Sequence, residues 1–265
     1  MPELYTENSE KWKALADIDY FTQFAKVWIP FNAWYRNYYP GLKREREIID
    51  TIKSSTNSFR SRLISLLPST NTNNEALVFR SHVAQLHYEL ERKHVHNSGK
   101  RITFEDIVVE INIKNLETFQ RFGLTYRAER QIAGHPKQEV HTILQPSQGV
   151  ARYSLIQPNG FNRAEMEAHN QFAQLSPNQQ VNLRKCYAEI DPCKPLSLLS
   201  NDPNECIMMD TYQFINDIDL LSKGIIEILY KLRNSLFHGE IIPDKDTNKV
   251  YGPTYQVLHM LIQAL

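Results

Sequence analysis

The strongest constraint on the fold is a long apolar periodicity in the last quarter of the chain. Apolar residues recur there at steps of three and four: Phe214, Ile218, Leu221, Ile225, Ile228, Leu232 and Leu236. This spacing places the apolar side chains on one face of a single α-helix. Gly239 suits the position just after a helix, and Pro243 prevents the helix from continuing. The pattern therefore predicts a long amphipathic helix that ends close to Gly239.

Three polar residues, Arg233, Asn234 and His238, occupy the end of this predicted helix. Asn234 and His238 are four residues apart and share a face, whereas Arg233 lies ~140° around the helix from His238. An Arg guanidinium is a permanent cation with several donors for phosphate oxygens, and imidazole exchanges a proton near neutral pH. The set suits phosphoryl transfer without a metal, in which His238 deprotonates a ribose 2′-hydroxyl and Arg233 stabilises the developing negative charge.

A structural interpretation of the same residues stays open, because cations at the end of a helix interact favourably with its macrodipole. Arg and His also follow one another at short spacing elsewhere, as in Arg80 with His87 and Arg163 with His169. Arg233 differs from these in its neighbouring Asn and in its place on a long periodic helix that ends at a glycine.

Two segments resemble the HEPN superfamily. One is the string R-N-S-L-F-H-G at positions 233–239, and the other is the aromatic stretch W-I-P-F-N-A-W-Y at positions 28–35. The resemblance implies a compact helical bundle that dimerises, so that two Arg/His sets face one another in a metal-independent endoribonuclease. It further implies that Arg233 and His238 are the catalytic pair and that Asn234 orients the His or the phosphate. Pro30 and a long central insertion depart from the superfamily pattern.

Such proteins are common in toxin–antitoxin and antiphage systems, so the resemblance makes RNA the expected substrate and an antitoxin or another defence protein a possible partner. The alternative is a catalytically inactive scaffold, or a module that binds a nucleotide or a partner, in which Arg233 and His238 serve structure or ligand binding. Loss of RNA cleavage in a folded His238→Ala variant would separate the two.

Candidate residues for substrate binding are Asn32, Arg60 and Arg62. Asn32 is a polar exception on an apolar, aromatic segment, and the segment between Arg36 and Arg62 carries a local excess of basic residues. The whole chain has 30 Lys and Arg against 30 Asp and Glu, so it lacks the overall basic charge that is usual for nucleic-acid-binding domains. A solvated helix face with alternating charges explains the basic segment equally well.

The predicted fold class is mainly α, a HEPN-like helical bundle with a small central α/β insertion. Residues 1–265 form one predicted domain, with helical parts at about 1–95 and 161–265 and a partly β insertion at 96–160. The expected elements are helices at 19–39, 44–67, 75–93, 163–175, 178–190 and 253–265, a short helix at 103–111, and strands at 122–128, 140–144 and 151–156.

No cofactor or metal is expected. The three cysteines, Cys186, Cys193 and Cys206, are odd in number and lack a C-x-x-C pair, so they are interpreted as reduced thiols. Four histidines, His82, His87, His94 and His96, show no familiar ligand spacing. The start of the sequence lacks a signal-peptide pattern and no apolar run is long enough to span a bilayer, so we expect a cytoplasmic protein.

Overall fold

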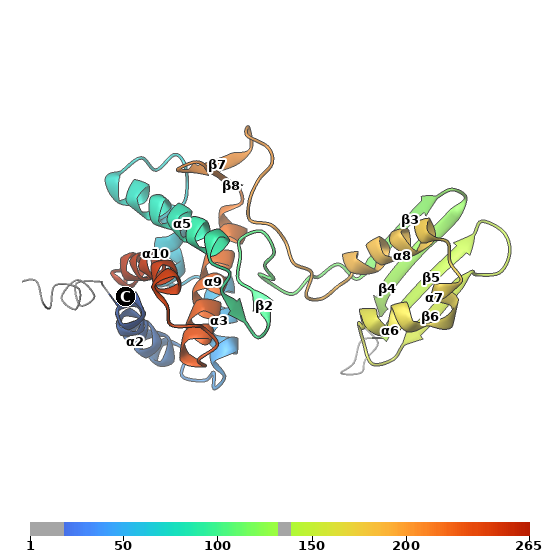
Figure 1. Cartoon of the computed structure of the whole chain (residues 1–265), viewed down its shortest axis with the longest axis horizontal. Coiled ribbons are helices and arrows are strands. Elements are labelled where there is room, and N and C mark those ends of the chain that lie inside the picture. Colours follow the sequence, from blue (N-terminus) through green and yellow to red (C-terminus); the bar gives the residue numbers. More distant parts are fainter. Residues whose placement is uncertain (1–18, 132–138) are drawn as a thin grey trace, which may run out of the picture. The chain divides into compact units, whose positions relative to one another are not determined.

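The computed structural model describes residues 19–131 and 139–265. These residues divide into two compact units (Figure 1). Unit 1 combines the residues up to Val109 with Leu196–Leu265, and unit 2 is the intervening segment Glu110–Pro195. Each unit has its own hydrophobic core. Unit 1 is therefore discontinuous in sequence.

The helices of unit 1 are α2 (Tyr20–Tyr38), α3 (Glu45–Ser54), α4 (Ser58–Leu66), α5 (Asn74–Arg92), α9 (Ile218–Phe237) and α10 (Lys245–Ile262). Its two short hairpins are β1 (His96–Asn97) with β2 (Lys100–Arg101), and β7 (Cys206–Met209) with β8 (Tyr212–Ile215). Helix α10 packs against α2 and α5, while α9 packs against α3, α4 and the β1–β2 hairpin. Helix α9 thus supplies one side of the unit 1 core.

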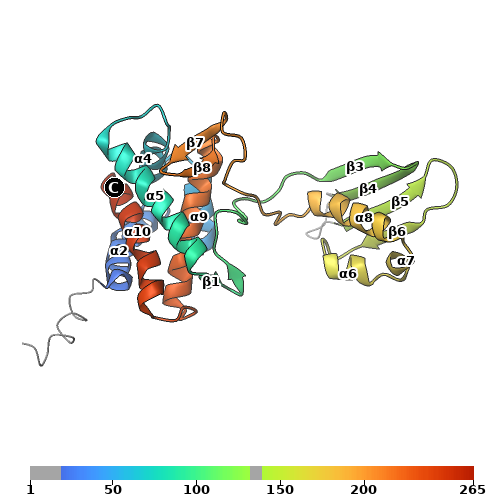
Figure 2. The ribbon, with the colours of Figure 1, turned by 45° about the horizontal axis from the view of Figure 1, so that its top comes forward.

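Unit 2 is an antiparallel sheet covered by helices. Its elements are β3 (Leu116–Arg121), β4 (Leu124–Gln131), β5 (Glu139–Pro146), β6 (Tyr153–Gln157), α6 (Arg163–Ala168), α7 (Asn170–Ala173) and α8 (Pro177–Glu189). The strands pair in sequence order, and the helices lie on one face of the sheet (Figures 1 and 2). Tyr126 and Tyr153 from the strands share the core with Leu183 and Tyr187 from α8.

The prediction of a mainly α fold is wrong. The described residues form nine helices and eight strands in three antiparallel sheets, with 49% of these residues in helices and 18% in strands, so the fold is mixed α/β. Most strands were missed because their sequences do not alternate clearly. In β3, for example, Leu116 and Phe119 are the only two apolar side chains, and they point to opposite faces.

The bounds of the middle segment also differ from the expected insertion at 96–160. Helices α6 to α8 were assigned to the bundle, but Leu183, Cys186 and Tyr187 pack on the sheet of unit 2 instead. Conversely, the hairpin at His96–Arg101 belongs to unit 1. The periodicity of a helix shows which face is buried, but not whether that face meets another helix or a sheet.

Several helix ends differ from expectation because local caps decide them. The predicted helix 44–67 is two helices, since Asn57 accepts a hydrogen bond from the Arg60 backbone N–H (2.8 Å) and starts α4. The last helix begins at Lys245, where Asp244 caps the Thr247 N–H (2.7 Å), and not at Pro253. The segment 103–111 is not helical; Ile107 pairs instead with Leu196 in an isolated antiparallel bridge.

Candidate functional site

The C-terminal end of α9 positions the three candidate catalytic residues. The backbone N–H of His238 donates to the Asn234 carbonyl (2.9 Å), and the Glu240 N–H donates to the Ser235 carbonyl (2.9 Å). Gly239 takes the left-handed conformation (φ +67°) that closes such a helix end with little strain. The predicted end of the helix is therefore confirmed. It leaves His238 exposed on the last turn.

The Arg233 guanidinium is held in place at one of its nitrogens. Nη1 lies 2.9 Å from Oε2 of Glu45 and donates to Oδ1 of Asn234 (3.0 Å). The guanidinium also lies over two aromatic rings, 5.9 Å from the Trp28 centroid and 4.9 Å from the Phe237 centroid. The side chain keeps 18% of its surface exposed. Asn234 therefore orients the Arg rather than the His in this chain.

Glu45 is in turn fixed by Tyr35. The Tyr35 hydroxyl donates to Oε1 of Glu45 (2.5 Å), so one carboxylate oxygen contacts Tyr35 and the other contacts Arg233. Burial, and then the hydrogen bond to Glu45, raise the pKa of Tyr35 well above its usual value, which keeps the hydroxyl protonated as a donor. Glu45 opens α3, where the helix macrodipole favours a negative charge.

Sequence reasoning missed both Tyr35 and Glu45. Tyr35 and Glu45 lie at facing ends of the consecutive helices α2 and α3, but Arg233 on α9 is far from both in the chain, so no short spacing connects the three residues. A weak signal existed in the position of Glu45, because an acidic residue in the first turn of a helix is favourable but does not itself require a basic partner.

Asn32 lies one helical turn after Trp28 on α2, so the two share a face. Oδ1 of Asn32, Nε1 of Trp28 and Nε of Arg233 are buried, and none has a hydrogen-bond partner within the described residues. Buried polar atoms are rarely left unpaired. Two of these atoms belong to side chains in contact, since the Arg233 guanidinium lies 5.9 Å from the centroid of the Trp28 ring. Asn32 therefore lies on the same face of α2 as Trp28, the residue that Arg233 contacts.

Arg60 and Arg62 lie elsewhere in unit 1. Arg60 forms an ion pair with Asp219, and Arg62 forms one with Glu75. Asp219 lies in the first turn of α9, about 20 Å along the helix axis from Arg233 at 1.5 Å per residue. The structure does not bring these two predicted substrate-binding residues to the end of α9 where Arg233 and His238 lie.

The β1–β2 hairpin lies beside the other face of the same helix end. The Ser235 hydroxyl donates to the His96 carbonyl (2.5 Å), and the Glu240 carboxylate accepts from the Ser98 N–H (2.7 Å) and from Asn97 Nδ2 (3.2 Å). These bonds attach the hairpin to Ser235 and Glu240, which lie before and after His238 in the sequence.

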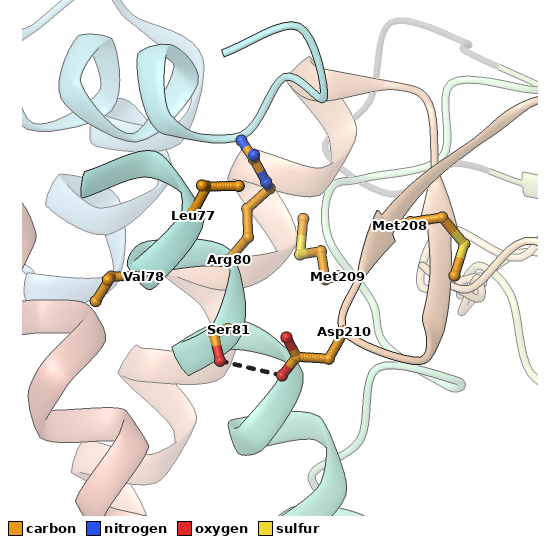
Figure 3. A pocket seen from close by; sticks show the side chains of 7 residues that line it. All are labelled: Leu77, Val78, Arg80, Ser81, Met208, Met209 and Asp210. Carbon is orange, nitrogen blue, oxygen red and sulfur yellow. Dashed lines mark hydrogen bonds between the residues drawn. The ribbon is translucent and has the colours of Figure 1, made fainter. Parts of the chain in front are cut away.

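A surface pocket of unit 1 lies between α5 and the β7–β8 hairpin, and its polar side chains have structural roles. It is lined by Leu77, Val78, Arg80, Ser81, Met208, Met209 and Asp210 (Figure 3). Arg80 donates to the carbonyls of Leu66, Pro68 and Asn71 at 2.8–3.1 Å, so its charge stabilises the end of α4. Ser81 donates to Asp210 (3.1 Å). The cation of this pocket is therefore already engaged with the protein backbone.

The cysteines and histidines are dispersed. Cys186 is buried, which raises its pKa to about 12, and its thiol donates to the Glu117 carbonyl (3.6 Å). His87 is buried against the rings of Phe104 and Tyr212. In the parts of the chain that the structure describes, no three His, Cys, Asp or Glu residues gather in a way that could hold a metal ion.

No family model matches this chain, and neither a curated protein nor a solved structure is significantly similar to it. Of the helices in residues 19–131 and 139–265, none combines the length and apolar character needed to cross a membrane.

Proposed function

We propose that the protein is a metal-independent endoribonuclease of the HEPN type that acts as a homodimer, as a defence or toxin effector. The observation that carries the proposal is the pairing, at one helix end, of a fixed cation with an exposed imidazole. Glu45 and Asn234 hold Nη1 of Arg233, while the described residues offer Nε no partner. His238 is exposed at the same end of α9.

The proposed reaction uses each group for one step. His238 accepts the proton of a ribose 2′-hydroxyl, whose oxygen attacks the adjacent phosphorus and expels the 5′-oxygen of the next nucleotide. Arg233 stabilises the negative charge on the non-bridging phosphate oxygens. The products are a 2′,3′-cyclic phosphate and a free 5′-hydroxyl, and the leaving oxygen needs a proton from an acid.

A homodimer would supply that acid. Each chain contributes one His238, and a two-fold axis would place two such helix ends opposite one another. An exposed apolar side chain at this end favours self-association, since Phe237, beside Arg233, is 50% exposed. We expect the protein to be a dimer at micromolar concentration, as measured by light scattering, and a fully active monomer would contradict the composite site.

The decisive experiment is cleavage of single-stranded RNA by the purified chain in excess EDTA. We expect cleavage to persist, to end in 2′,3′-cyclic phosphates and to fail on 2′-O-methylated RNA. His238→Ala should abolish cleavage with an unchanged melting temperature, and the matched control His259→Ala, on α10, should cleave normally. Full activity in the His238→Ala variant would reject the proposal.

A second function, an inactive scaffold or ligand-binding module, is favoured by one observation. The Glu45 carboxylate pairs with the Arg233 guanidinium, and such a pairing is typical of a cation with a structural role. This alternative expects wild type to show no cleavage, and Arg233→Ala to lower the melting temperature because Glu45 and Tyr35 lose their partner.

A further inference from the structure

A small cavity opens beside the C-terminal end of α9. Its volume is ≈ 190 Å³. Its walls come from the segment after α5, from the loop between α9 and α10, and from the first turn of α10: Lys93, His94, Val95, His96, Glu240, Ile241, Ile242 and Thr247. Pockets for whole drug-sized ligands are usually larger, roughly 300 Å³ and above. The size therefore fits a single planar ring system.

The cavity is fixed relative to His238. Ser235, one turn before His238, bonds to the His96 carbonyl, and Glu240, two residues after it, bonds to Asn97 and Ser98. The Glu240 carboxylate is thereby engaged, and Lys93 is paired with Asp244 (2.8 Å). Both charged side chains of the walls are therefore already paired with other groups of the protein.

The exposed wall residues that a ligand would contact are two imidazole rings, of His94 and His96, and the aliphatic side chain of Ile242. Val95 is buried at 4% exposure, whereas His94 and His96 on either side of it are exposed, as the alternation of an extended segment requires. Ile242 is 72% exposed at the opposite wall. Imidazole rings are among the side chains on which proteins stack the unpaired bases of RNA.

Two lysines lie close to the helix end, Lys231 on α9 and Lys100 on β2. Lys231, Ser235 and His238 share one face of α9, at steps of four and three. Burial lowers the pKa of Lys231, and the charges of Arg46, Lys100 and Lys53 act in the same direction, against the opposing effect of Glu227. Lys100 lies in β2 and is exposed. Ser235 is fully buried beneath the hairpin, so the exposed Lys100 of β2 is the cation that this region offers to a phosphate.

We propose that this cavity, between the β1–β2 hairpin and the loop before α10, binds the base of a single-stranded RNA nucleotide next to the scissile phosphate. His94 and His96 stack on that base. The inference rests on the proposed ribonuclease function and adds to it a subsite for the substrate.

The test measures binding separately from cleavage. A short fluorescein-labelled, fully 2′-O-methylated RNA serves as the probe, because it lacks the attacking hydroxyl, and fluorescence anisotropy of the full chain gives its affinity. We expect His94→Ala and His96→Ala each to weaken binding about 10-fold, the size of one lost stacking contact. His96→Phe, which keeps a ring, should bind nearly as wild type does. His259→Ala is the matched control and should not change binding.

The outcomes separate the subsite from the chemistry. If wild type binds the probe but cleaves no RNA, and His94→Ala and His96→Ala lose binding, the subsite stands and the ribonuclease proposal fails. If wild type cleaves RNA and both Ala variants bind and cleave normally, the subsite is rejected and the ribonuclease stands. Wild type that does not bind the probe, or His96→Phe that binds as weakly as His96→Ala, also overturns the inference. Circular dichroism of each variant confirms that it is folded.

Discussion

The Arg233 side chain owes its orientation to residues that contact no expected substrate atom. Glu45 contacts Nη1, and Tyr35 contacts Glu45, so a chain of two hydrogen-bonding side chains from α2 and α3 fixes a residue on α9. A charge held this way needs little reorganisation when a phosphate arrives. The same contacts restrict the rotamers of the long Arg233 side chain before any ligand binds.

Replacing Glu45 tests this orientation at the residue scale. We expect Glu45→Gln to lower kcat for RNA cleavage about 10-fold with little change in KM, because the guanidinium loses its fixed position rather than its charge. Steady-state kinetics measure both parameters. The matched control is Glu47→Gln on the same helix, since Glu47 contacts the exposed Arg44 (3.7 Å). Equal kinetics for the two variants would count against a positioning role for Glu45.

At the scale of elements, a buried ionic cluster joins α3 to α9. Glu227 lies 2.9 Å from Lys53 Nζ and 2.8 Å from Arg46 Nη1, and the Glu227 and Lys53 side chains are each 4% exposed. Lys53 also donates to the Val109 carbonyl (2.8 Å). Burial opposes the charge of Glu227, but its hydrogen bonds with Arg46 and the two positive charges bring its pKa below the usual 4.5.

The direction of this shift predicts how stability depends on pH. A lowered pKa in the folded state stabilises the fold fully above pH 4.5, and this contribution is lost as pH falls through the folded-state pKa. Glu227→Gln should cost about 3 kcal/mol at neutral pH, since it leaves the buried Lys53 with only the half-exposed Asp50 as an ionic partner. It should also flatten the fall in stability below pH 4.5. Urea unfolding at several pH values measures both effects.

Glu205→Gln is the control for this prediction, because Glu205 is exposed in the turn before β7. It should change neither the stability nor its pH dependence. If Glu227→Gln loses stability with falling pH as steeply as wild type does, the acid sensitivity comes from other groups and the prediction is wrong.

The elements that were predictable from sequence are those with a strong local signal. The apolar stripe and the terminal glycine predicted helix α9 and its end. Its start was not predicted, because the stripe began at Phe214, which lies in β8, whereas the Asp217 cap (2.9 Å to the Leu220 N–H) starts the helix at Ile218. The candidate pair Arg233 and His238 was found because it lies on that helix. The sequence did not predict the roles of Glu45, Tyr35 and the hairpin at His96, because these roles depend on tertiary contacts that no periodicity encodes.

At the scale of the whole molecule, unit 2 is a continuous segment inserted between Val109 and Leu196 of unit 1. Ile107 and Leu196 exchange two backbone hydrogen bonds of 3.0 Å each, so the chain leaves unit 1 and re-enters it at neighbouring positions. A segment whose ends lie this close can be replaced by a short turn without stretching the rest of the fold.

This geometry predicts that unit 2 can be excised. A chain in which a short Gly/Ser linker replaces Glu110–Pro195 should fold, unfold cooperatively and keep the arrangement around Arg233, because the unit 1 core contains no residue of unit 2. Calorimetry and RNA cleavage measure these properties. Glu110–Pro195 expressed alone should also fold, around Tyr126 and Leu183. An excised chain that stays unfolded would show that unit 1 depends on its insert.

The discontinuity of unit 1 also sets the order in which the protein is completed on the ribosome. Helices α2 to α5 are synthesised first, unit 2 follows, and α9 with α10 comes last. Unit 2 contains its whole core in one continuous segment and can fold while translation proceeds. The early helices must wait for α9, whose buried face completes their core. Arg233 and Glu45 therefore meet only after the whole of unit 2 has been synthesised.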